Sequence, residues 1–274
     1  MTRTLRAALA AFAVLTIFAP ALAIGAPPPP LDRWFTLQLD GARIGWMHEQ
    51  RTVDGDEITT PSTTRMTIKR GELALSFTIG SSFRETRAGE PIEFRASQDM
   101  GVAKQTTVFT FTEDGVTQTA NGRTQTLPRP AGDWMTPARA AAYTAERIAA
   151  GDDDFTISVL SPLAGLEPVS VRRYQFEPAN VEVLGKTVPG LRCVSTTSEA
   201  PGVESVEFLD ESGEVLRTTA NMGAMEITML LATEELAKMP VEAPELMRSL
   251  FIAPNRNIIG ARRTRRAEYR LTVA

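Results

Sequence analysis

The side chains that could act in catalysis are few and lie far apart in the sequence. His48 is the single histidine among 274 residues, and Cys193 is the single cysteine. A thiol nucleophile needs a nearby base or a helix N-terminus to lower its pKa, and Cys193 lies inside a predicted strand. His48 also lacks the second histidine, one helical turn away, of a zinc-protease motif. We therefore predict a core position for Cys193 and a surface or half-buried strand position for His48, with ligand contact by His48 as the alternative.

Clusters of charge do not supply a clear catalytic group either. Asp152-Asp153-Asp154 lacks the alternating ligand positions of a calcium loop, which favours a solvated turn. The run Arg262–Arg266 could meet a phosphate or an acidic surface, but charge runs usually lie in solvent. A hydrolase could use Asp99, Glu113 or Asp133, but no spacing selects a pair. We predict no catalytic constellation, no metal and no cofactor.

Aromatic residues on predicted strands are the better candidates for contact with a ligand or a partner. Such side chains bring a large apolar surface to an interface. With the histidine that neighbours two of them, the candidates are Trp34, Trp46, His48, Phe77, Phe109 and Phe111.

The first residues have the pattern of a secretory signal peptide. Arg3 and Arg6 precede an apolar run from Ala8 to Phe18, and Ala21-Leu22-Ala23 fits the cleavage rule. The run is too short to cross a bilayer stably. We therefore expect removal of residues 1–23, a periplasmic or extracellular location and no stable membrane span afterwards. A retained membrane anchor is the alternative.

The expected mature chain is acidic and has no internal disulfide. Loss of the two arginines leaves 27 basic and 33 acidic residues, a net charge of −6. This charge opposes nucleic-acid binding, which needs a basic surface. A single cysteine cannot form an internal bridge, so the fold must depend on its core. The proline-rich residues 24–30 predict a stiff spacer before that fold.

Beyond the spacer, the pattern is one strand after another. Trp34–Leu39 alternates, Asp40-Gly41 is a tight-turn signal, and Ile44–Val53 is the predicted return strand. Similar alternating runs and turns continue to Leu231, including separate predicted strands at Val169–Phe176 and Asn180–Leu184. Because large twisted sheets do not stay flat, the meander should curl.

One helix interrupts the strands. Thr136 can cap it, Pro137 suits its first position, and an alanine-rich stripe runs to Gly151. The predicted fold class is mainly β: a long antiparallel meander curled into a half-barrel, or into a barrel like those of lipocalins and lipoprotein carriers. A mid-chain helix at 137–150 and short C-terminal helices complete it.

The predicted β domain covers residues 31–240. Residues 241–274 form a C-terminal extension and a possible start of a following domain. Within it, Pro244–Leu250 is a possible helical turn, and Arg262–Val273 reads as an isolated strand.

Several of these stretches resemble the N-terminal β domain of bacterial exported transglutaminase-like proteins. The opening WFTLQLDGARIGWMHEQ, with its tryptophan-led strand and Ile44-Gly45-Trp46 return, carries the likeness. The hairpin VEFLDESGEVLRTTANMGAMEITM, the segment ATEELA and the tail RRTRRAEYRLTV also resemble parts of it. That family's catalytic core has a Cys, His and Asp triad, and no such core is present in this sequence.

The resemblance implies an exported, non-catalytic accessory or binding module. Its partner would be another protein or a downstream transglutaminase-like core. One alternative is a periplasmic carrier of an apolar ligand, because the meander is also similar to exported lipocalin-like and lipoprotein-carrier-like half-barrels. Another is a fragment of a thiol-dependent transglutaminase-like or protease-like enzyme.

Overall fold

The computed structural model describes residues 29–70, 73–101, 103–223, 225–242 and 244–245. The signal-peptide prediction, most of the spacer and the predicted strand at Arg262–Val273 lie outside these residues. The strands and helices are β1 (Leu31–Leu39), β2 (Ala42–Asp54), β3 (Glu57–Arg70), β4 (Leu73–Thr86), β5 (Pro91–Asp99), β6 (Lys104–Thr112), β7 (Gly115–Ala120), β8 (Arg123–Leu127), α2 (Pro137–Ala150), β9 (Asp154–Leu160), β10 (Pro168–Val183), β11 (Lys186–Thr197), β12 (Glu204–Leu209), β13 (Val215–Met222), β14 (Met225–Ala232) and α3 (Glu234–Lys238).

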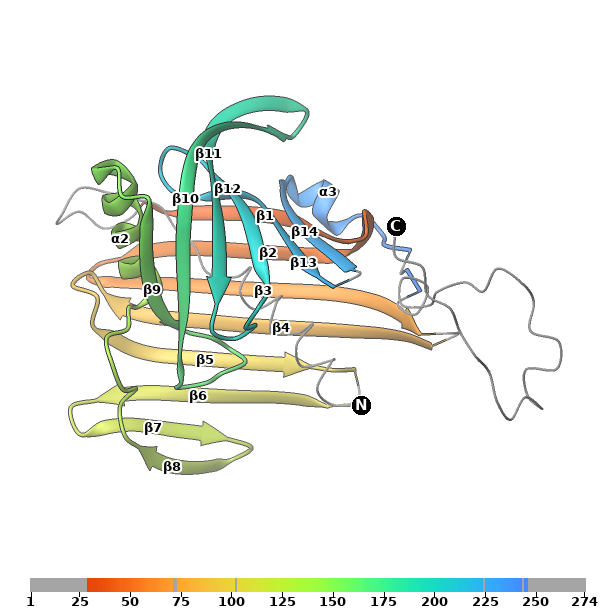
Figure 1. Cartoon of the computed structure of the whole chain (residues 1–274). Coiled ribbons are helices and arrows are strands. Elements are labelled where there is room, and N and C mark those ends of the chain that lie inside the picture. Colours follow the sequence, from red (N-terminus) through yellow and green to blue (C-terminus); the bar gives the residue numbers. More distant parts are fainter. Residues whose placement is uncertain (1–28, 71–72, 102, 224, 243, 246–274) are drawn as a thin grey trace, which may run out of the picture.

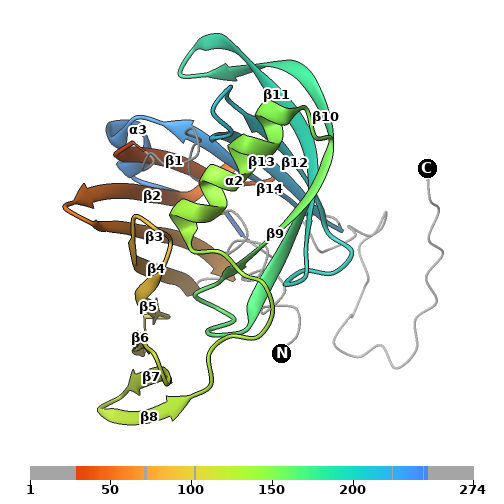
Figure 2. The same ribbon diagram turned by 90° about the vertical axis from the view of Figure 1, so that its left-hand side faces the viewer.

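All the strands belong to one 14-stranded sheet, in the order β8-β7-β6-β5-β4-β3-β2-β1-β14-β13-β12-β11-β10-β9. The described strand pairs are antiparallel, and β8 and β9 do not pair with each other. Figures 1 and 2 show the sheet curling so that β9–β12 face the wall formed by β1–β4. The predicted mainly-β class and curled antiparallel meander are therefore confirmed, as an open half-barrel.

The first hairpin depends on two glycines. Gly41 has φ +77° in the turn, a conformation that suits glycine. A Cβ on Gly45 would lie 1.9 Å from the carbonyl oxygen of Arg65 on β3. Since only a hydrogen fits there, Gly45 permits β2 and β3 to pair at this point.

Helix α2 lies between the two facing walls (Figure 2). It starts at Pro137, and its C-cap Gly151 has φ +77° and donates to the carbonyl of Ile148. The buried face consists mainly of small side chains, which let the helix pack closely on both walls. These residues are Ala138, Ala140, Ala141, Thr144 and Ala145.

The interior contains two apolar clusters. The main core joins both walls and α2 and includes Phe35, Leu37, Met47 and Met229. The second cluster lies under β4–β7 and is rich in aromatic rings; its buried members are Phe83, Phe94, Ala96, Phe109, Phe111, Val116 and Leu160. We call the second one the aromatic cluster.

The structure also corrects one local prediction, and a second one lies mostly outside the described residues. The predicted pair of strands Val169–Phe176 and Asn180–Leu184 is a single strand, β10, with a register shift between Tyr174 and Glu177. Of the predicted helical turn at Pro244–Leu250, only Pro244 and Glu245 are described. The backbone of these two residues runs beside Lys69 of β3, whose N–H donates to Pro244 O at 2.9 Å.

Candidate functional site

Three of the six candidate contact residues meet on the outer face of β1 and β2. Trp34 stacks on His48 at 3.7 Å between ring centroids, and Trp34 and Trp46 lie 5.3 Å apart. Lys238 of α3 lies 4.5 Å above the ring of Trp34. A hydrogen bond between His48 Nε2 and Asp32 at 2.7 Å lowers the pKa of Asp32. We call Trp34, Trp46 and His48 the outer aromatic group.

The other three candidates lie inside the half-barrel. Phe77 belongs to the main core, while Phe109 and Phe111 belong to the aromatic cluster. Phe111 lies 5.8 Å from Trp134, between ring centroids. The structure therefore separates the candidates into an outer group and an inner group.

Cys193 is fully buried in the main core. Burial and the nearby carboxylate of Glu207 raise the pKa of the Cys193 thiol to about 12. His48 lies on the outer face, with Asp32 as its partner. Cys193 therefore has the core position predicted for it, and His48 has the predicted half-buried strand position. The two side chains do not form a thiol–histidine pair.

We expect Cys193 to resist thiol reagents in the folded protein. The high pKa keeps the thiol protonated, and complete burial keeps the reagent away from it. Labelling with an aromatic disulfide at pH 8 should be slow in buffer and rapid in denaturant. Fast labelling of the native protein would mean that the thiol is accessible and would contradict this core position.

The three carboxylates considered for hydrolysis do not converge on the interior. Glu113 and Asp133 are exposed in connecting segments. Asp99 ends β5 and accepts from the N–H of Gly101 at 2.9 Å. Among the described residues, no group of three or more His, Cys, Asp or Glu side chains is arranged to hold a metal ion.

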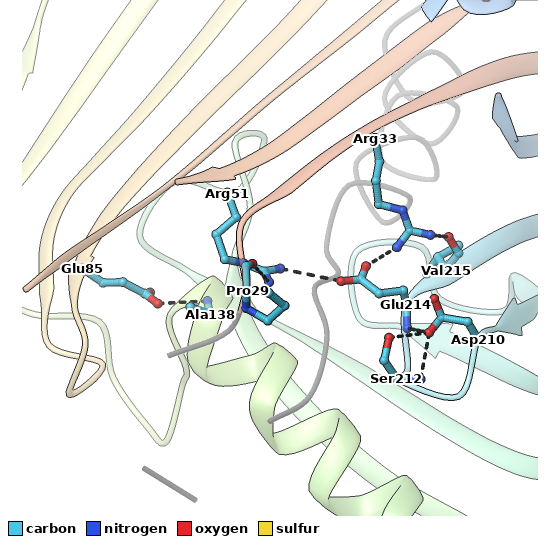
Figure 3. Close-up of polar contacts among 9 residues, drawn as sticks. All are labelled: Pro29, Arg33, Arg51, Glu85, Ala138, Asp210, Ser212, Glu214 and Val215. Atoms are coloured by element: carbon cyan, nitrogen blue, oxygen red, sulfur yellow. Dashed lines mark hydrogen bonds and ion pairs between the residues drawn. The ribbon is translucent and has the colours of Figure 1, made fainter. Parts of the chain in front are cut away.

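Sequence reasoning missed a group of buried charges inside the half-barrel. We call Arg33, Glu49, Arg51, Glu85 and Glu214 the interior charge cluster. Arg51, Glu49, Glu85 and Glu214 are each less than 5% exposed. Buried charges are costly unless they are paired, so such a group needs a structural or functional reason. Figure 3 shows four of its members, all except Glu49.

Glu214 reaches the cluster from the turn between β12 and β13. Asp210 fixes the turn, because its Oδ1 accepts from the N–H groups of Ser212 and Glu214, each at 2.9 Å. Arg33 of β1 then donates to Glu214 Oε2 and to the carbonyl of Val215. This contact ties the first strand to the opposite wall.

Arg51 of β2 lies beside that pair. Its Nη1 donates to the carbonyl of Pro29 at 3.2 Å, and its Nη2 lies 3.9 Å from Glu214 Oε1. Within the described part of the chain, neither Nε nor Nη2 of Arg51 has a hydrogen-bond partner, and Glu214 Oε1 has none either. Burial lowers the pKa of Arg51, and Glu214, Glu49 and Glu85 oppose that effect.

Glu85 of β4 performs the capping that Thr136 was expected to perform. The Thr136 side chain does not bond to the helix, whereas Glu85 Oε1 accepts from the N–H of Ala138 at 3.0 Å. A carboxylate at a helix N-terminus is favourable because the helix dipole is positive there. Glu85 therefore joins α2 to the β1–β4 wall (Figure 3).

Burial raises the pKa of both Glu85 and Glu214 to about 7. Hydrogen bonds from Thr136 and Ala138 oppose this rise for Glu85, as do the charges of Arg33 and Arg51 for Glu214. The two carboxyls are therefore expected to lose their protons near neutral pH, far above the usual range of glutamate.

The stability of the protein should consequently fall as the pH rises through 7. A carboxyl whose folded pKa exceeds its unfolded pKa stabilises the fold fully below the unfolded value, and this contribution is lost as pH rises through the folded value. Each group can contribute up to about 3 kcal/mol. Urea unfolding between pH 5 and pH 8 measures the slope, and Glu85→Gln should reduce it. A slope that the substitution leaves unchanged would contradict the assignment to Glu85.

A second buried ion pair holds α2 to the other wall. Arg173 of β10 donates from Nε and Nη2 to Glu207 Oε2 at 2.9 and 2.7 Å. Ser195 donates to Glu207 Oε1 at 2.6 Å, and Arg173 Nη1 donates to the hydroxyl of Thr144 on α2 at 3.4 Å. Because these hydrogen bonds compensate both buried charges, we assign the Arg173–Glu207 pair a structural role.

Comparison with known proteins bears on the fold. No family model matches the chain, and no curated protein matches it. Among solved structures, a β-barrel-like protein of a domain of unknown function (DUF1849) from Brucella abortus is similar, with a TM-score of 0.56 and 14% sequence identity. The match covers 74% of this chain and 96% of that chain. At this identity the likeness concerns the fold alone, and it agrees with the β-barrel-like architecture.

The described helices do not include a candidate membrane span. Neither α2 nor α3 combines the length and the apolar character that crossing a bilayer requires.

Proposed function

We propose that the chain is an exported, non-catalytic binding protein whose half-barrel holds an apolar or amphipathic ligand against its inner face. The observation that carries this proposal is the way the aromatic cluster is covered. Trp134 and Leu166, which pack on it, belong to the connections β8–α2 and β9–β10 rather than to strands or helices. Connecting segments rearrange at lower cost than strands, so a ligand can replace them on the aromatic rings.

The open form of the sheet supports the same proposal. Because β8 and β9 do not pair, the aromatic cluster lies in a wing of the sheet whose far edge is free. Barrels and half-barrels with apolar inner faces are suited to small hydrophobic molecules. The inert position of Cys193 argues against a thiol-dependent enzyme, which would need an accessible thiolate beside a base.

Organic extraction of the purified protein, followed by mass spectrometry, tests the proposal. We expect a co-purifying apolar molecule, or uptake of a fluorescent fatty-acid probe by the extracted protein. Trp134→Ala should weaken the uptake, while Trp46→Ala, in the outer aromatic group, serves as the matched control. Ligand-free protein that takes up no probe would refute the carrier function.

The outer aromatic group favours a second candidate, an accessory module for a protein partner. Leu236 and Met239, in and just after α3, are 42% and 53% exposed, and α3 packs on β1 and β2. Aromatic side chains beside exposed apolar ones are frequent at protein interfaces. A transglutaminase-like core, in the same or another chain, is the partner that the sequence resemblance suggests.

Peptide mapping of the polypeptide from its native host tests this second candidate. Peptides that continue beyond Ala274 into a region with Cys, His and Asp would support it. If the native polypeptide ends at Ala274, a purified transglutaminase-like protein from the same host is the partner to assay. Failure of the wild-type chain to bind that protein would then count against the accessory role, and His48→Ala would show whether the outer aromatic group contributes to any binding seen.

A further inference from the structure

The edge of the Arg51 guanidinium formed by Nε and Nη2 is the most unusual polar feature of the interior. Arg51 is fully buried, and its hydrogen bond to Pro29 uses Nη1. The Nε and Nη2 donors, which lie side by side on one edge, have no hydrogen-bond partner among the described residues, although Nη2 lies 3.9 Å from Glu214 Oε1. Leaving two buried donors unbonded is costly, so the arrangement needs an explanation.

Other arginines of this chain show what that edge binds. Arg84, Arg172 and Arg173 each donate from Nε and Nη2 to one carboxylate, at 2.5 to 3.3 Å; Arg172 reaches both oxygens of Asp154, whereas Arg84 and Arg173 each reach one oxygen of their glutamate. Two parallel N–H donors match the two oxygens of a carboxylate, and the pairing is strong because both groups are charged. Arg51 presents the same edge to Glu214, whose Oε1 lies 3.9 Å from Nη2, too far for a hydrogen bond.

We propose that Arg51 binds the carboxylate of an amphipathic ligand whose apolar chain lies against the inner face of the half-barrel. This inference rests on the proposed carrier function and adds the chemical class of the ligand, a long-chain carboxylic acid. Ile44 and Met47 lie on the same inner side of β2 but are 2% and 1% exposed within the main core, so the apolar chain of the ligand would replace side chains that now pack on them. The ligand would thus have a charged end on Arg51 and an apolar remainder.

The charges around Arg51 determine the pH range in which the site can bind an anion. Arg33 faces the site from β1, Glu49 from β2, Glu85 from β4 and Glu214 from the β12–β13 turn. With Glu85 and Glu214 protonated, the two arginines face one carboxylate and the site carries a positive charge. With both ionised, three carboxylates outnumber the arginines and repel an anion.

Access to the Arg51 edge is expected from the side of Pro29. This residue precedes β1, is exposed, and contacts the cluster through its carbonyl oxygen. A segment that lies before the first strand and holds Arg51 by one hydrogen bond can move without breaking a strand pair. The hydrogen bonds to the incoming carboxylate then replace the one that Arg51 loses to Pro29.

The test compares dodecanoic acid with its methyl ester by calorimetry on the mature chain at pH 6. The acid should bind at least about tenfold more tightly, since a hydrogen bond to a charged group contributes that much. Arg51→Gln should remove this preference, and Arg51→Lys should retain only part of it, because lysine lacks the paired donors. Arg172→Gln, which breaks a surface Arg–Asp pair, is the matched control and should leave the preference intact.

A second readout does not depend on any variant. Binding of the acid should weaken by about tenfold from pH 6 to pH 8 if one proton is taken up with the ligand. The methyl ester should show no such change. With carboxyl-labelled dodecanoic acid, the bound ¹³C signal should titrate below its usual pKa, because Arg51 favours the ionised form.

The outcomes separate this inference from the carrier function. A preference for the acid that Arg51→Gln abolishes supports both. Equal binding of acid and ester, unaffected by the substitution, overturns the role of Arg51 and leaves the carrier function standing. Absence of binding by either probe overturns the two together.

Discussion

Arg173→Ala is expected to lower the free energy of unfolding by about 3–5 kcal/mol, the usual cost of breaking a buried ion pair. Arg173 is fully buried, and Glu207 is 2% exposed. Removal of the guanidinium leaves the Glu207 carboxylate inside the protein with the hydroxyl of Ser195 as its remaining described donor. The hydrogen bond from β10 to Thr144 of α2 disappears as well. The helix should therefore loosen from the β9–β12 wall.

The neighbouring residue provides the control. Arg172 also donates from Nε and Nη2 to a carboxylate, that of Asp154, but both side chains are about half exposed. Arg172→Ala should lower the free energy of unfolding far less than Arg173→Ala does, because exposed ion pairs contribute little. Chemical unfolding of the two variants, followed by far-UV circular dichroism, measures the difference. Equal losses would show that burial of the Arg173–Glu207 pair does not determine its importance.

Gly45→Ala is expected to be similarly severe, with a loss of about 3 kcal/mol, at the upper end for overpacking. The new Cβ would lie 1.9 Å from the Arg65 carbonyl oxygen and 2.7 Å from Met66 Cα. Both are backbone atoms of β3, so no side-chain rotation relieves the clash. Strands β2 and β3 would have to separate in the middle of the sheet.

Gly80→Ala is the matched control for this prediction. A Cβ on Gly80 of β4 would meet Ser97 Oγ at 2.6 Å, with the next atom at 3.8 Å. The Ser97 hydroxyl can turn away, so the loss should be below about 1 kcal/mol, as for most tolerated substitutions. Thermal unfolding of both variants tests the contrast. A mild effect of Gly45→Ala would mean that the β2–β3 register adjusts easily.

The sequence was sufficient to predict the fold class, because the strands alternate with period two and the turns carry glycine. The Asp40-Gly41 turn and the helix that begins at Pro137 follow from local chemistry alone. The single long β10 was missed because a register shift and the positive φ of Gln175 (+58°) interrupt its alternation.

Part of the interior charge cluster had a usable signal in the sequence. Glu49 and Arg51 share the parity of the buried Met47, and Glu85 shares that of the buried Phe83. Continuing the inward alternation by one or two positions would have placed these charges inside the barrel. Charged side chains are almost never fully buried unless they are paired, so the alternation alone gives a weak signal for them.

Glu214 could not be found in this way. It lies in a turn rather than a strand, and its direction depends on the hydrogen bonds of Asp210 and on Gly213, next to which α2 packs. Its partner Arg33 is 181 residues away along the chain. Local sequence patterns carry no information on such a distant pairing.

The strand order determines where the chain can be opened and joined in a circular permutant. The first and last strands, β1 and β14, are neighbours in the middle of the sheet, and the two sheet edges, β8 and β9, are successive strands in the chain. Trp34 of β1 lies opposite Ala232 of β14, so the beginning of one strand adjoins the end of the other. A circular permutant opened in the segment 128–136, with a short linker from Ala232 to Leu31, would keep every strand pair. Among the described strands, β1–β14 is the one pairing that joins strands far apart in the sequence, and its formation should limit the rate of folding.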